Sequence, residues 1–298
     1  MSSETAVRPS ISELENNALG NVKDQKSEFG NISKVFNGVP HLEEDTIFVN
    51  KFKIHSRFGW DDRFGATYFA LPLNDSKELV LRIDSGSRKE PTNLFAETAL
   101  LKKAESSHNY LLFSQIHSYD LTAKYPWLAV YNRDGPTVHQ CIQFLEEKKF
   151  SHGTAGRFAF DILSILQFLH NNAFLATNLN MDIFRYDPCS RNVFLADLSY
   201  VRIDPSKRQL RIKPNITWMG TPHFAPLAFH GNADLTQWDE LEAFFYIFYE
   251  MVVGKLPWDG KRLDEIVTTK LLFSQEDNFK DLPEQYLNLL GSKLRLRD

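Results

Sequence analysis

Hydrophobic and polar residues alternate in short segments over roughly the first half of the chain, and these segments are rich in β-branched and aromatic residues. Such alternation is typical of half-buried strands. The predicted strands of an antiparallel sheet are residues 48–54, 65–71, 78–83, 110–117 and 127–131. One stretch, residues 92–103, instead repeats its apolar positions at helical spacing, and Glu97 falls within that apolar stripe. A carboxylate in such a place needs a partner, because burying an unpaired charge is costly.

After Gly135 and Pro136 the pattern changes to helical periodicity. The predicted helices are residues 138–148, 155–170, 237–253, 263–272 and 284–290. Residues 237–253 are apolar almost all round, which favours a buried central helix, and Gly254 follows as a C-cap. By contrast, residues 1–45 are polar, poor in aromatic residues and without a sustained period, and this composition predicts a disordered N-terminal arm.

Composition narrows the class of protein. The chain has 298 residues and 43% hydrophobic residues, enough for a large core, and its formal net charge is −4. Nucleic-acid binders are usually basic, so no nucleic-acid partner is expected. The two cysteines, Cys141 and Cys189, lack metal-ligand spacing and are expected to be buried structural thiols. The N-terminus lacks the apolar core of a signal peptide and no apolar run is long enough for a membrane span, so we expect an intracellular protein, cytoplasmic or nuclear.

One stretch, residues 174–199, carries the most distinctive layout. A helical run leads into it, two short apolar segments flank a turn that contains Pro188, and Asp197 ends the second segment. Residues 170–184 resemble, without gaps, the catalytic-loop motif of the casein kinase I family of protein kinases. Four further motifs resemble that family in the same order: Gly135-Pro136-Thr137, Gly220-Thr221 with Phe224-Ala225, residues 239–242, and Leu256-Pro257-Trp258. Five motifs in register make a chance match improbable.

The resemblance implies a fold class and a domain organisation. The fold is expected to be α+β and two-lobed, with a small antiparallel β lobe that carries one helix and a larger, mainly helical lobe. The small lobe would comprise residues 46–131, and the large lobe residues 132–298. The last helices of the large lobe are expected to be shortened or absent.

In the small lobe, the resemblance implies that Arg82 replaces the lysine that contacts nucleotide phosphates, with Glu97 as its helix partner. An arginine fork pairs well with a carboxylate, so an Arg82–Glu97 bridge is the favoured interpretation and a nucleotide contact the alternative. Tyr131 stands at the gatekeeper position of the nucleotide pocket. Trp60 and Asp62 stand where the phosphate-binding loop has glycines, and a bulky ring and an anion oppose phosphate binding.

In the large lobe, the resemblance places four residues at the chemical centre. Asn178 replaces the catalytic Asp, and an amide is not a base near neutral pH. Asn180 replaces the lysine that stabilises the transferred phosphoryl group. Ile183 replaces the metal-binding Asn, and a hydrocarbon cannot bind Mg²⁺. Asp197 keeps the position of the metal-binding Asp and would hold the ion poorly alone, or would accept hydrogen bonds from backbone amides instead.

Three neighbouring residues complete the expected site. Asp182 aligns outside the metal site and is expected at the surface. Ser199 replaces a glycine and limits the backbone freedom of its loop. By analogy with the family, Asp239 is expected to bond the backbone of the loop at residues 176–178.

These substitutions together predict a catalytically inactive casein kinase I-like pseudokinase, a scaffold or regulatory protein-interaction module. No catalytic residue and no cofactor are expected, and the partners would be proteins, such as an active kinase or a kinase substrate. Two alternatives stay open: an ATP-binding switch without turnover, which would use Arg82, Glu97, Tyr131 and Asp197 with Mg²⁺, and a Ser/Thr protein kinase with atypical active-site residues. A fold by itself does not decide among them.

Overall fold

The computed structural model describes residue 32 and residues 34–61, 65–86, 93–107, 109–207 and 215–273, without the side chains of Trp60 and Asp61. The chain divides into two compact units. The small unit contains the described residues up to Thr98 together with Ile116–Asn132. The large unit contains Ala99–Gln115 and the described residues from Arg133 onward.

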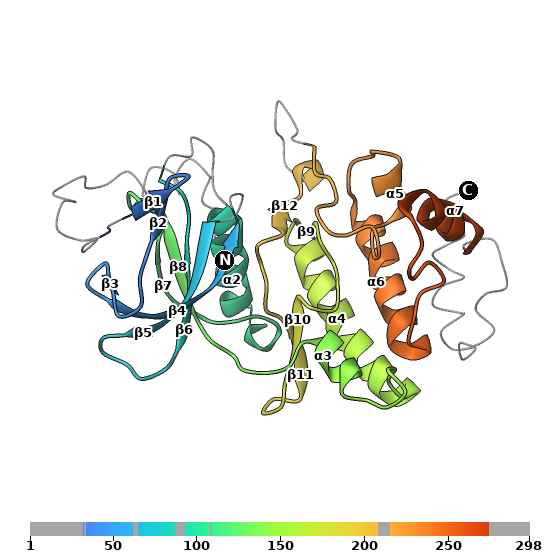
Figure 1. The fold of residues 1–298 in the computed structure, drawn as a ribbon, viewed down its shortest axis with the longest axis horizontal. Coiled ribbons are helices and arrows are strands. Elements are labelled where there is room, and N and C mark those ends of the chain that lie inside the picture. The colour runs from blue at the N-terminus through green and yellow to red at the C-terminus, as the bar shows by residue number, and fades with distance from the viewer. Residues whose placement is uncertain are drawn as a thin grey trace, which may run out of the picture. The chain divides into compact units, whose positions relative to one another are not determined.

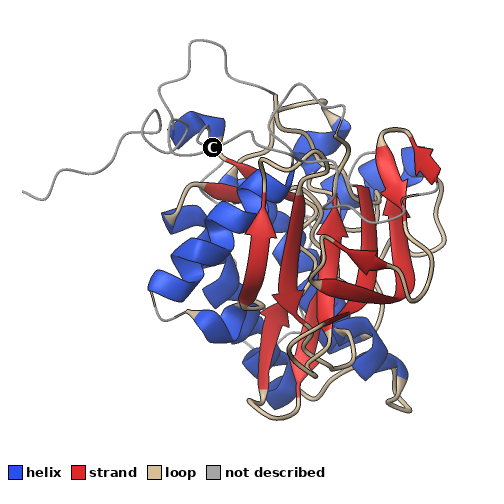
Figure 2. Ribbon diagram, turned by 90° about the vertical axis from the view of Figure 1, so that its left-hand side faces the viewer, coloured by secondary structure: helices blue, strands red, loops and turns tan. Residues whose placement is uncertain are grey.

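The small unit is built on one six-stranded antiparallel sheet with the order β3-β4-β5-β6-β8-β7 (Figures 1 and 2). Its strands are β3 (Ile47–Phe48), β4 (Phe52–Asp61), β5 (Gly65–Pro72), β6 (Leu79–Ile83), β7 (Ile116–Asp120) and β8 (Trp127–Tyr131). The alternation that predicts strands is visible in β5, where Ala66, Tyr68 and Ala70 are buried and the residues between them are half-buried. The sheet therefore has one face in the core and one partly exposed face.

Part of the predicted N-terminal arm is folded. Strands β1 (Lys34–Phe36) and β2 (Val39–His41) form a hairpin, and Val39 and Leu42 lie in the core of the small unit. The Leu42 amide also donates to the Tyr68 hydroxyl at 3.2 Å. Placing the whole of residues 1–45 in a disordered arm was therefore wrong for residues 34–45, while the arm's earlier residues, apart from residue 32, lie outside the described part of the chain.

The predicted strand at residues 110–117 is wrong in its first half. Residues 110–112 form a 3₁₀ turn, η1 (Tyr110–Leu112), and the strand β7 begins only at Ile116. Phe113 is fully buried in the large unit, where its ring lies 5.2 Å from that of Phe168. The aromatic and aliphatic residues of this stretch thus serve core packing rather than a strand, and composition alone does not separate the two.

The large unit is mainly helical. Its helices are α3 (Val138–Gln143), α4 (His152–Asn171), α5 (Leu227–His230), α6 (Gln237–Val253) and α7 (Leu263–Phe273), and η2 (Pro205–Lys207) is a 3₁₀ turn. Helix α2 (Asn93–Ser106) begins in the small unit and continues into the large one. Two antiparallel strand pairs accompany the helices: β10 (Phe184–Asp187) with β11 (Asn192–Leu195), and β9 (Phe174–Ala176) with β12 (Val201–Ile203).

Helices α4 and α6 pack against each other and form the centre of the large unit (Figure 1). Ser151 caps α4, and its hydroxyl accepts a hydrogen bond from the Thr154 amide. A capping box of Thr236 and Asp239 opens α6, and Gly254 ends it with a φ of 94°, a left-handed conformation that favours glycine. Helix α6 spans the predicted residues and is largely buried, as its pattern predicts.

The structure corrects two predictions on the large unit, and a third lies outside the described residues. Helix α3 ends at Gln143 rather than at residue 148. Cys189 is exposed and Cys141 is half-buried, so the expectation of two buried thiols was wrong. The predicted helix at residues 284–290 lies outside the described residues. Among the helices that the structure describes, none combines the length and apolar character needed to cross a membrane.

Candidate functional site

In the small unit, the predicted bridge between Arg82 and Glu97 is present. Arg82 lies on β6, Glu97 lies on α2, and Arg82 Nη1 donates to Glu97 Oε2. The two residues are 8% and 1% exposed. A buried ion pair of this kind is costly to break, because removal of either partner leaves a charge in a poorly solvated place. The contact fixes the start of α2 to the sheet.

Two further small-unit residues stand at positions that the family resemblance singles out. Gly65 begins β5 with a φ of +85°, and a Cβ atom there would lie 2.1 Å from the Ile83 carbonyl oxygen. The backbone of this hairpin therefore requires a glycine whether or not phosphate binds. Tyr131 ends β8, and its ring packs edge-on against His117 at 5.5 Å, with Lys77 Nζ 5.7 Å from its centroid.

In the large unit, the loop between β9 and β10 carries the two asparagines that replace catalytic residues. Asn180 Nδ2 donates to Asn178 Oδ1 at 3.0 Å, and Asn180 Oδ1 accepts from the amides of Asp182 at 2.8 Å and Ile183 at 3.2 Å. Gly220 packs closely against the side-chain amide of Asn178. A Cβ atom at this glycine would lie 2.2 Å from Asn178 Oδ1. Both side chains thus hold the loop in shape.

The carboxylate of this loop, Asp182, lies at the surface, as predicted. Its Oδ1 accepts a hydrogen bond of 3.1 Å from the hydroxyl of Thr137. Thr137 is also the N-cap of α3, where it forms a capping box with Gln140. Asp182 therefore connects the loop to the start of α3.

Ile183 and Asp197 stand at the two positions where the family resemblance implies metal ligands. Ile183 is 5% exposed, and its carbonyl accepts from the amides of Ala196 at 2.9 Å and Asp197 at 3.4 Å. Asp197 Oδ1 accepts from the Ser199 amide at 2.9 Å and from the Ser199 hydroxyl. One carboxylate that is already hydrogen-bonded, beside a hydrocarbon, is a poor donor set for Mg²⁺. Among the residues that the structure describes, no three His, Cys, Asp or Glu side chains form a group suited to a metal ion.

The acid that bonds the backbone of this loop is Glu240, not Asp239 as predicted. Glu240 Oε1 accepts from the Ala176 amide at 2.6 Å, and Oε2 pairs with His170 Nε2 at 2.9 Å. Asp239 accepts from the amide and hydroxyl of Thr236 in the capping box. Glu240 is fully buried, and this burial raises the pKa of its carboxyl against the opposing effect of His170.

Glu240→Gln is expected to lower the free energy of unfolding by about 1–3 kcal/mol, because the amide weakens buried hydrogen bonds that a carboxylate makes. Urea denaturation of the full chain measures the change. The matched control is Glu146→Gln, at an exposed position after α3, where a surface substitution should stay within about 0.5 kcal/mol. Equal effects of the two substitutions would contradict the role of Glu240.

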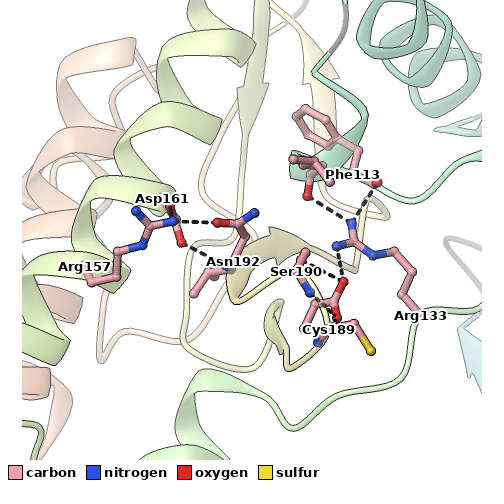
Figure 3. A network of polar contacts seen from close by, with 10 residues as sticks. Phe113, Arg133, Arg157, Asp161, Cys189, Ser190 and Asn192 are labelled. Atoms are coloured by element: carbon pink, nitrogen blue, oxygen red, sulfur yellow. Dashed lines mark hydrogen bonds and ion pairs between the residues drawn. The ribbon is translucent and has the colours of Figure 1, made fainter.

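Sequence reasoning missed a second polar network around the β10–β11 turn (Figure 3). Arg133 donates to the carbonyls of Leu111 and Phe113 at 3.0 and 3.1 Å, and to Asp187 Oδ2 at 2.8 Å. Its guanidinium carbon also lies 3.9 Å from the centroid of the Phe194 ring. Partial burial raises the pKa of Asp187, but its hydrogen bonds, above all that from Arg133, outweigh burial and hold the pKa at about 2.

The same carboxylate organises the turn itself. Asp187 Oδ1 accepts from the amides of Cys189 at 2.8 Å and Ser190 at 3.3 Å, and Oδ2 accepts from the Ser190 hydroxyl at 2.9 Å. An Asp before a Pro is a turn signal in the sequence, but nothing there identifies Arg133 as its partner. The network therefore fixes the hairpin that follows the degenerate loop.

Comparisons with known proteins show which proteins this chain is similar to. No protein-family model matches the chain. The chain is 27% identical over 237 residues to the piRNA biogenesis factor prde-1 of Caenorhabditis elegans. It is 24% identical over 229 residues to a Dictyostelium discoideum protein named as a serine/threonine-protein kinase, and 21% identical over 226 residues to a C. elegans protein named as a casein kinase I. The matches cover 75%, 75% and 73% of this chain, but only 42%, 45% and 64% of the three relatives.

Among solved structures, the chain resembles vaccinia related kinase 3 with a TM-score of 0.62 and 18% identity, over 80% of this chain and 78% of that one. The fold is therefore the α+β protein kinase fold, with a small antiparallel β lobe that carries a helix and a larger, mainly helical lobe. Together with the relatives named as kinases, this supports the protein kinase superfamily for the chain.

Proposed function

We propose that this protein is a catalytically inactive casein kinase I-like pseudokinase that acts as a scaffold or a regulatory protein-interaction module inside the cell. The observation that carries the proposal is the bonding within the β9–β10 loop. Asn178 and Asn180, which by the family resemblance replace base and cation, are hydrogen-bonded to each other, and Asn180 also accepts from two amides of the loop backbone. Loss of a general base alone commonly costs about 10²–10⁴ in rate, and catalytic groups that act as a unit leave little activity once several are gone.

The surroundings of the loop support the same proposal. The carboxylate of Asp182 is bound to Thr137, and the carboxylate of Asp197 is bound to Ser199. Neither acid is arranged as a base for a substrate hydroxyl, and the amides of the asparagines have no basic site. In the small lobe, the Arg82–Glu97 pair is engaged within the protein. The partners are proposed to be proteins, such as an active kinase or one of its substrates.

Two further functions follow from the fold and are separated by experiment. A nucleotide-binding switch would bind ATP without turnover, through Arg82, Glu97, Tyr131 and Asp197. An active Ser/Thr kinase with atypical residues would also turn ATP over. The observation that favours the switch is the cation Arg82 beside Glu97. An arginine can still contact phosphate oxygens of a nucleotide.

Thermal unfolding of the full chain with ATP, in EDTA, Mg²⁺ or Mn²⁺, tests the proposal, and we expect no shift of the midpoint. A ligand at about 100 times its dissociation constant stabilises a protein by about 2.7 kcal/mol, and 1 kcal/mol moves the midpoint by roughly 2–4 °C in a domain of similar size. Bound nucleotide would therefore be visible as a shift of several degrees.

The Asp197→Ala variant is the control for that measurement. A shift that needs metal and disappears in Asp197→Ala would overturn the proposal and support the switch. Phosphate release that is also lost in Asp197→Ala would support the enzyme instead. Unchanged midpoints in every condition would leave protein contacts as the function to pursue.

A further inference from the structure

The large unit has a groove that the proposed function does not yet use. It is a surface depression, more open than enclosed, with a volume of about 550 Å³ between the first turns of α4 and the β10–β11 turn. Gly153, Arg157 and Phe158 line it from α4, and Tyr186, Ser190 and Arg191 line it from the hairpin. This volume lies within the range of about 300–1,000 Å³ that is common for ligand sites, and it exceeds the space of a few waters.

The groove combines positive charge with an apolar floor. Both charged residues of its lining are arginines, Arg157 and Arg191, and both are exposed. The rings of Phe158 and Tyr186 stack at a centroid distance of 5.4 Å with an interplanar angle of 18°. Beside Arg157, at 6.0 Å from its guanidinium carbon, lies the ring of Phe160, which is 64% exposed. A ligand that fits would carry negative charge next to an apolar group.

Two carboxylates on the elements that line the groove, Asp187 and Asp161, are engaged in contacts within the protein. Asp187 is bonded to Arg133 and to the amides of its own turn. Asp161 accepts from the Val193 amide at 2.9 Å and lies 3.4 Å from Arg157, so it offsets part of the charge of that arginine. Arg191 therefore contributes the larger share of the positive potential.

The groove walls are held in place before any ligand binds. Arg157 Nη2 donates to Asn192 Oδ1 at 2.5 Å, which connects α4 to the hairpin. The Arg191 amide donates to the Asp187 carbonyl at 2.8 Å, and the Ser190 hydroxyl is bonded to the Asp187 carboxylate. Rigid walls reduce the ordering cost of association, so a small groove of this kind can bind a short segment.

We propose that this groove binds an acidic peptide segment of a partner protein. Carboxylates of the peptide would contact Arg191 and Arg157, and an apolar side chain between them would pack on Phe158 and Tyr186. The inference rests on the proposed function in one respect, namely that the protein acts through contacts with other proteins. It adds where on the large unit a partner binds and which kind of segment it presents.

Gly153 provides a direct test. A Cβ atom at this glycine would meet no atom within 4 Å, so a side chain there extends into open space. Gly153→Glu would place a negative charge in the groove, and an acidic residue in the first turn of a helix is favourable for the helix itself. The fold should therefore persist while the groove is blocked. Gly153→Ala and Gln167→Glu, an exposed position on the same helix, are the matched controls.

The measurement is fluorescence anisotropy of the full chain with a fluorescein-labelled peptide of alternating Glu and Leu, at low and physiological salt. We expect binding that Gly153→Glu and Arg191→Glu each weaken at least about tenfold, that both controls preserve, and that salt weakens. A peptide of alternating Lys and Leu should not bind.

Several outcomes would overturn the inference. These are no binding of the acidic peptide up to about 1 mM, equal binding of the Lys–Leu peptide or of oligothymidylate, and acidic binding that Gly153→Glu leaves unchanged. The thermal shift with ATP is a separate measurement. A shift there shows nucleotide binding and rejects a module that acts through protein contacts alone, without bearing on the groove. A failed peptide test rejects the groove and leaves the result with ATP unchanged.

Discussion

Glu97→Ala is expected to lower the free energy of unfolding by about 3–5 kcal/mol, because it leaves the Arg82 guanidinium buried without its partner. Arg82 is 8% exposed and Glu97 is 1% exposed, so water cannot replace the lost contact. Arg82→Ala should also be destabilising, since it removes the guanidinium that pairs with the buried Glu97 carboxylate. Urea denaturation of the full chain, with the slope checked for constancy, measures both values.

The double variant Arg82→Met/Glu97→Leu is the matched control for this pair. Well-packed hydrophobic residues of similar volume often replace a buried ion pair with little loss, or with a gain in stability. We expect the double variant to recover most of the stability that either single alanine variant loses. Single variants that each cost less than about 1 kcal/mol would contradict a structural pair and would favour a role for Arg82 in contacting phosphate.

Lys270 is expected to make the protein more stable as the pH rises from about 7 to about 10. Its side chain is fully buried, and Nζ donates to the carbonyls of Pro222 at 2.7 Å and of Ala225. Nζ also lies 5.0 Å from the ring centroids of both Tyr246 and Trp258. Burial lowers the pKa of Lys270 from 10.5 to about 7, against a smaller opposing effect of Glu242.

The direction of the effect follows from which state holds the proton. Between about pH 7 and 10.5 the unfolded chain keeps the Lys270 proton while the folded chain has released it, so stability rises with pH in this window. The rise is at most about 1.4 kcal/mol per pH unit, or about 4 kcal/mol over three units. Below about pH 7 both states are protonated and the contribution no longer changes. A neutral amine still has two N–H groups for the two carbonyls.

Lys270→Met is the comparison that isolates this effect. Other groups titrate in the same range, but they do so in both proteins, so the difference between the two stability curves reports Lys270. Urea denaturation at several values between pH 7 and 10 should show a wild-type curve that rises relative to the variant. Parallel curves would contradict the lowered pKa.

The contacts of Lys270 fix the segment that follows Gly220 and Thr221 to α7. The charge state of Lys270 therefore bears on the stability of that segment.

Much of the fold could be predicted from the sequence because its signals are local. Strand β8 and helix α6 have the predicted bounds, since alternation and apolar density are properties of short segments. The Arg82–Glu97 pair was also predictable, because a carboxylate in an apolar stripe needs a cation and the family motif offered one. The proposed loss of catalytic groups at Asn178, Asn180 and Ile183 rests on residue types at positions that the family motif identifies.

Other features depend on how segments far apart in sequence pack. Adjacent residues of a helix point about 100° apart, so only the packing of α6 decides that Glu240, rather than Asp239, reaches the Ala176 amide. The partners of Asp187 and Lys270 lie 54 and 45–48 residues away along the chain. Likewise, the groove forms only when the first turns of α4 meet the β10–β11 turn.

The sequence by itself thus determined the fold class and most of the main elements, because residue type and local periodicity carry that information. Tertiary structure alone decided that Glu240 bonds the β9–β10 loop, which carboxylates pair with a cation, and where two arginines flank the apolar floor of the groove. These depend on distances between residues that no local pattern encodes, and on burial, which sets what each charge costs and which partner it needs.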